Sequence, residues 1–149
     1  IKHAKQIMIA FRQVIIVLRR KTNYDCLRQT VVKIMQESQL RDLSKEFAKD
    51  IIKLCRELKH NAVEGALLNQ LLRCGTSIGA NIHEAQYAQG RKDFISKFEI
   101  ALKECNECEY WLQLLYETDS LTEDRYVIFQ KNCINLRRML VSSVKTLKK

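Results

Sequence analysis

The chain contains no proline in 149 residues, and this absence limits the folds open to it more than any other feature. It also has only four glycines, Gly65, Gly75, Gly79 and Gly90. A β-rich fold of this length needs many turns, and turns draw on glycine, proline and asparagine. The length suits one domain with its own core. We therefore expect an all-α protein of a few long helices joined by short connections.

Apolar residues recur at steps of three and four in four segments from residue 40 onwards, which is the spacing of one helix face. The pattern predicts helices over residues 40–58, 66–89, 95–116 and 122–144. Because the links are short, neighbouring helices should run antiparallel. The predicted fold is an antiparallel up-down four-helix bundle of residues 39–149, preceded by an N-terminal helical extension of residues 1–38.

Local signals predict how these helices begin, end and pack. Asp42 or Ser44 is expected to cap the first of the four. Gly75 and Gly79 weaken a helix interior, so a neighbouring helix should approach closely there. Gly90 should end the second helix in a left-handed conformation. The third helix has a heptad stripe of Ile95, Phe98, Leu102, Cys105, Glu109, Leu112 and Tyr116, and the fourth should bury Tyr126, Phe129, Cys133, Leu136, Leu140 and Val144.

The extension has an apolar segment from Ile7 to Leu18, flanked by lysines and arginines. This segment is too short to cross a membrane. Two interpretations stay open: it lies on an anionic membrane surface, or it packs on the bundle or on a second subunit. A second short helix, Tyr24 to Gln36, should link it to the bundle.

The net charge of +9 is concentrated at the two ends of the chain. Residues 1–39 hold eight lysines and arginines against two acidic residues, and no acidic residue follows Asp124. The basic residues of that C-terminal part include Lys131, Arg137, Arg138, Lys145, Lys148 and Lys149. Basic faces favour phosphate backbones or anionic lipid. Lysines that only keep the protein soluble are the alternative.

Six cysteines lie mostly within helical periodicity, and no cleavable signal peptide is visible. We expect free, buried thiols in a reducing cytoplasm. The C-x-x-C of Cys105 and Cys108 falls in mid-helix, and a zinc site would need a second pair of ligands. Glu57 and His60 have the Glu-x-x-His spacing of bundle metal sites but lack a partner motif. We expect no metal and no cofactor.

Four polar residues are candidates for a structural polar core. Asn81 and Glu84 lie one helical turn apart, and Glu109 falls in an apolar stripe, where Arg73 or Arg137 could neutralise it. A polar core that fixes helix register is the first interpretation. A catalytic acid/base pair is the second, but no nucleophile or phosphate-binding loop accompanies it. We expect no enzymatic activity and assign no catalytic residue.

The block LLRCGTSIGANIHEA at residues 71–85 resembles the signature of the bacterial four-helix bundle proteins encoded in 23S rRNA intervening sequences. The likeness continues through KDFISK at 92–97, ALKE at 101–104 and EYWL at 109–112, and it covers roughly residues 40–145. It implies a small non-enzymatic bundle that assembles into a ring, typically a pentamer. A related branch, the accessory variability determinant proteins of diversity-generating retroelements, binds nucleic acid and a reverse transcriptase.

The leading functional hypothesis is a homo-oligomer that binds nucleic acid without sequence-specific contacts to bases, and RNA is the expected ligand. The contacts would come from the six basic residues Lys131, Arg137, Arg138, Lys145, Lys148 and Lys149. A reverse transcriptase partner is an extrapolation from the related branch. One alternative is a structural assembly module that holds protein partners through its N-terminal helix. Another is a metal-dependent enzyme.

Overall fold

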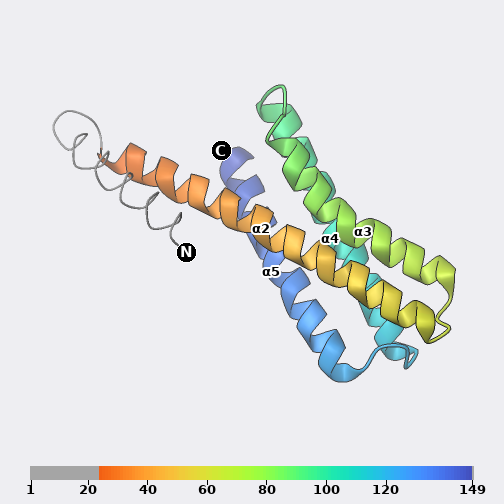
Figure 1. Cartoon of the computed structure of the whole chain (residues 1–149). Helices are drawn as coiled ribbons and strands as arrows, with labels where there is room; N and C mark the ends of the chain where they lie inside the picture. Colours follow the sequence, from red (N-terminus) through yellow and green to blue (C-terminus); the bar gives the residue numbers. More distant parts are fainter. Residues whose placement is uncertain (1–23, 149) are drawn as a thin grey trace, which may run out of the picture. The chain divides into compact units, whose positions relative to one another are not determined.

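The computed structural model describes the backbone of residues 24–148 and the side chains of residues 38–148. Within that part, the chain forms four helices and no strand: α2 (Tyr24–His60), α3 (Gly65–Ala85), α4 (Arg91–Glu117) and α5 (Glu123–Lys148). The packed bundle belongs to the unit Gln36–Lys149. The α2–α3 and α4–α5 links lie at one end of it and the α3–α4 link at the other (Figure 1). The predicted all-α four-helix bundle is confirmed, while the predicted helix at 7–18 lies outside the described residues.

One long helix replaces two predicted ones, since α2 runs unbroken from Tyr24 to His60. No proline or glycine occurs in this stretch, so nothing in the backbone forces a break between the predicted segments. The predicted caps are therefore wrong. Ser44 is buried inside the helix, and its hydroxyl donates to the Arg41 carbonyl at 2.8 Å.

The two mid-helix glycines of α3 face α2, which confirms the predicted close approach. A Cβ built on Gly75 would lie 2.9 Å from the side chain of Ile51, closer than carbon atoms pack. A Cβ on Gly79 would lie 3.4 Å from the Ser44 carbonyl oxygen, an ordinary contact. The helix-propensity cost of Gly75 is thus offset by backbone packing that no side chain would permit.

Leucine, isoleucine, phenylalanine and cysteine side chains from all four helices fill the core. The buried side of α5 is Phe129, Cys133, Leu136, Leu140 and Val144, as predicted, with Tyr126 half-buried. In α4 the buried side is Phe98, Ala101, Cys105, Cys108, Leu112 and Leu115. The predicted α4 stripe was thus partly wrong: Ile95, Leu102, Glu109 and Tyr116 are only half-buried. Small residues at 101 and 108, which a search for large apolar side chains overlooks, face the centre instead.

Two helices end in the same motif, and neither uses glycine. After α2 the amides of Ala62 and Val63 donate to the carbonyls of Lys59 and Leu58. This is a Schellman motif with Ala62 at the left-handed position, φ 60°. After α4, Asp119 takes that position with φ 57°. The predicted left-handed cap at Gly90 is wrong, because α3 ends at Ala85 and Gly90 is extended, φ 176°, at the start of α4.

Candidate nucleic-acid interface

Three of the predicted phosphate contacts form one stripe along α5. Lys131, Arg138 and Lys145 are all exposed and stand seven residues apart. Seven residues make almost two whole helical turns, so the three share one face at intervals of about 10 Å. Among the described residues, the ion pairs of α5 involve Arg125, Arg137 and Lys148 instead. We call Lys131, Arg138 and Lys145 the α5 stripe.

The other three predicted contacts are placed differently. Arg137 is half-buried against α4, with Nε 2.9 Å from Oε1 of Glu109. The ammonium of Lys148 lies 2.6 Å from the carboxylate of Glu99. Lys149 lies outside the described residues. The structure therefore separates the predicted set into an exposed stripe and two cations that hold α5 to α4.

The four predicted polar-core residues do not come together. Arg73 is exposed and donates to Glu107 at 2.6 Å, with Glu104 3.9 Å away. Glu84 is also exposed and pairs with Lys97 at 2.6 Å. Asn81 is half-buried and donates to the Ser77 carbonyl of its own helix at 2.9 Å. Of these four residues, Glu109 has a half-buried partner, Arg137 of α5, whereas Arg73 and Glu84 stand at the exposed edges of α3.

Two half-buried carboxylates on α4 are electrostatically perturbed. Burial raises the pKa of Glu104, and Glu107 adds to the rise while Arg73 opposes it. Burial also raises the pKa of Glu109, with Cys133 adding to the rise and Arg137 opposing it. One buried oxygen of Glu104 has no hydrogen-bond partner among the described residues. Desolvation therefore outweighs the neighbouring cations at both positions.

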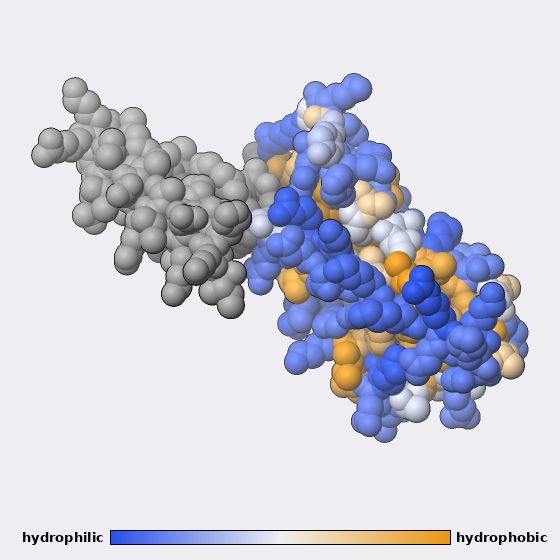
Figure 2. Space-filling view, in the orientation of Figure 1, coloured by the Kyte–Doolittle hydropathy of each residue, from blue (hydrophilic) through white to orange (hydrophobic). Residues whose placement is uncertain are grey.

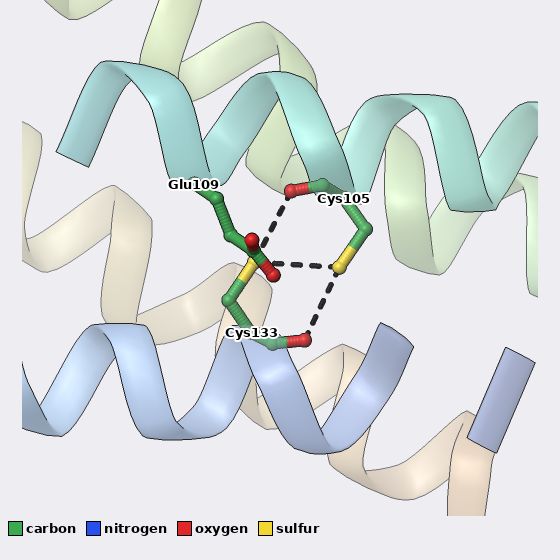
Figure 3. A group of neighbouring side chains, drawn as sticks. All are labelled: Cys105, Glu109 and Cys133. Atoms are coloured by element: carbon green, nitrogen blue, oxygen red, sulfur yellow. Dashed lines mark hydrogen bonds between the residues drawn. The ribbon is translucent and has the colours of Figure 1, made fainter. Parts of the chain in front are cut away.

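The core also gathers side chains that the sequence did not place together. The thiols of Cys105 and Cys133 lie 3.3 Å apart, and the carboxylate of Glu109 points at the pair (Figure 3). One ligand atom from each of the three residues lies within 4.8 Å of the others. These are donor atoms that transition metals accept. Cys105 and Cys133 were each predicted to be buried, but their contact across α4 and α5 was not predicted.

Most of the bundle face shown in Figure 2 is hydrophilic, with small hydrophobic areas between. The large apolar side chains that remain exposed among the described residues are Leu43, Tyr87, Ile100, Tyr110, Val127 and Ile128. None of the described helices has a stretch apolar and long enough to traverse a bilayer. The exposed apolar groups are thus scattered over α2, α4, α5 and the α3–α4 link.

Comparisons with known proteins agree with one another. The sequence profile of the family described as "23S rRNA-intervening sequence protein" matches residues 36–142. A crystal structure of a protein of unknown function from the S23 ribosomal protein family of Bacteroides thetaiotaomicron VPI-5482 is 44% identical, with a TM-score of 0.72. The match covers 74% of this chain and 98% of that one. No curated protein matches.

Proposed function

The chain belongs to the 23S rRNA-intervening sequence protein family, and on that premise we propose that it is a non-enzymatic, oligomeric bundle that binds RNA. The α5 stripe would contact phosphates of the backbone and leave the bases unread. Such contacts hold nucleic acid by charge, so affinity should depend on salt and little on sequence.

The observation that carries the proposal is the absence of acid from the stretch after Asp124, which contains most of α5. Other exposed cations of the bundle alternate with carboxylates. On α2, for example, Lys49 pairs with Glu46 and Lys53 with Asp50. A phosphate that approaches the α5 stripe meets no repelling charge on that helix surface, with exposed Asn135 and Ser142 between the cations.

Self-association, as a pentameric ring, is the second part of the proposal. The adjacent exposed residues Val127 and Ile128 on α5 support it, because a subunit interface would bury them together. A ring would also repeat the α5 stripe, and several weak phosphate contacts on one RNA add up to strong binding through effective concentration.

The test measures mass by light scattering, with and without a structured RNA, at low and high salt. We expect an oligomer that takes up RNA at low salt and releases it at high salt. Each chain that places three contacts on the RNA should add about −2 to −3 to the log–log salt slope. An RNA hairpin of unrelated sequence and equal length should bind about as well.

The decisive variant reverses the stripe: Lys131→Glu, Arg138→Glu and Lys145→Glu together. Its matched control is Lys45→Glu, Arg56→Glu and Lys59→Glu, which makes the same charge change at exposed positions of α2, close to Glu46, Asp50 and Glu57. RNA binding should be lost in the first variant and largely kept in the second. Equal losses would mean that net charge, not the α5 stripe, governs binding.

A further inference from the structure

A cluster of thiols occupies the centre of the bundle, apart from the α5 stripe. Cys105 and Cys133 face each other from α4 and α5, and each thiol also donates to the other's carbonyl at 3.3 Å. Cys108 of α4 and Cys74 of α3 belong to the same buried core cluster. All four are buried and free.

The spacing of the donor atoms suits one metal ion. Two thiolates on a tetrahedral zinc ion, each at about 2.3 Å, lie about 3.8 Å apart. The sulfurs of Cys105 and Cys133 are already 3.3 Å apart. Glu109 adds a carboxylate oxygen within 4.8 Å of both. A modest rearrangement of the three side chains would therefore admit the ion.

Charge balance also favours a divalent ion. Two thiolates and the Glu109 carboxylate carry three negative charges. A divalent cation and the Arg137 guanidinium, 2.9 Å from that carboxylate, carry three positive ones. Buried ions are tolerated when their charges are matched in this way. Arg137 thus acts as a counter-charge beside the donors, not as a ligand.

The site lies near the edge of the α4–α5 contact and has a satisfied metal-free form. The Glu109 side chain is 25% exposed, whereas both sulfurs are buried. Without metal, the thiol protons are held by the two carbonyls. Those carbonyls keep their helical hydrogen bonds when the protons leave.

We propose that Cys105, Cys133 and Glu109 bind a thiophilic divalent cation, zinc in the first place, between α4 and α5. Binding replaces the two thiol protons, which pass to the solvent, and forms two metal–sulfur bonds and one metal–oxygen bond. The ion would join the two helices at mid-length and fix their register.

The test is a cobalt titration of the full folded chain under a phosphine reductant, followed by zinc. We expect about one cobalt ion per chain, with a thiolate-to-metal charge-transfer band and tetrahedral visible bands that zinc abolishes. Zinc should also raise Tm. A wild-type chain that gives no charge-transfer band at stoichiometric cobalt, with its thiols shown to be reduced, would overturn the proposal.

Variants locate the site. Cys133→Ala should abolish the charge-transfer band, and Glu109→Gln should weaken cobalt binding about tenfold or more. The matched control is Cys26→Ala with Cys55→Ala, which removes two cysteines outside the donor set and should leave the band unchanged. If circular dichroism shows that Cys133→Ala does not fold, Glu109→Gln still tests the site, because Glu109 lies at the edge of the α4–α5 contact. Equal cobalt affinity in Glu109→Gln and the wild type would overturn the assignment.

Discussion

The guanidinium of Arg137 lies 2.9 Å from the carboxylate of Glu109, across the contact between α4 and α5. The next residue, Arg138, is exposed on the α5 stripe. Two adjacent arginines therefore have different roles: one holds two helices together, and the other is free to meet a polyanion.

Reversing the charge of Arg137 should destabilise the fold, whereas reversing the charge of Arg138 should not. Arg137→Glu places a second carboxylate beside Glu109 in a half-buried site, so the free energy of unfolding should fall by about 2 kcal/mol. Arg138→Glu should change it by no more than about 0.5 kcal/mol, as exposed substitutions usually do. Urea unfolding followed by circular dichroism measures both. Equal stabilities would contradict the assignment of Arg137 to the helix contact.

Alanine at the two glycines of α3 should have opposite effects. Gly75→Ala forces a methyl group against Ile51, whose β-branched side chain cannot move aside easily, and should cost about 1–3 kcal/mol. Gly79→Ala meets only an ordinary contact and should gain up to about 1 kcal/mol from helix propensity. Thermal unfolding of both variants provides the comparison. A stabilised Gly75→Ala would show that α2 can shift away from α3.

Replacing Ala62 by glycine at the C-terminal end of α2 should stabilise the fold. Ala62 holds a left-handed conformation that costs a side-chain-bearing residue roughly 1–2 kcal/mol. Part of that is offset by the flexibility that glycine adds to the unfolded chain, so Ala62→Gly should stabilise the fold by about 0.5–1 kcal/mol. The matched control, Ala80→Gly on the exposed side of α3, should destabilise it by about 1 kcal/mol. Chemical denaturation distinguishes the two.

Glu104→Gln should alter the pH dependence of stability. Burial raises the pKa of this carboxyl above its ordinary value of 4.5, so the folded state binds its proton more tightly than the unfolded state does. The wild type therefore loses stability as pH rises from the unfolded pKa through the folded one. Glu104→Gln lacks this loss, and its stability relative to the wild type should grow between pH 4 and pH 7. Glu117→Gln, at an exposed position, sets the baseline, and a constant difference at position 104 would contradict the cause assigned here.

The fold could be predicted because its determinants are local. The absence of proline and the apolar residues at steps of three and four predicted the helices. The short links between them predicted their antiparallel order. Helix ends were harder, since Ala62 and Asp119 take a conformation that the sequence pattern reserves for glycine. The run of residues from Tyr24 to Leu40 has no cap signal strong enough to decide between one helix and two.

The thiol cluster could be predicted only in part, because it depends on pairing between helices. Cys105 and Cys133 each lie fourteen residues from Asp119 in the α4–α5 turn. An antiparallel pair folded about that turn brings such positions opposite each other, so this symmetry was the available signal. Which side chains meet also depends on helix rotation, which a one-residue error in the buried stripe changes by about 100°. Glu84 and Arg73 were predicted in the polar core as partners of Asn81 and Glu109, but both are exposed on α3.

The buried cysteines allow local opening of the bundle to be measured without introducing a probe. A thiol reagent can modify a buried cysteine only after the surrounding helices separate, so labelling rates measure the free energy of that separation under native conditions. Cys55 donates to the Leu68 carbonyl and would report opening between α2 and α3. Cys105 and Cys133 would report opening between α4 and α5. Comparing the two sets of labelling rates therefore shows whether the α2–α3 and α4–α5 hairpins open together or independently.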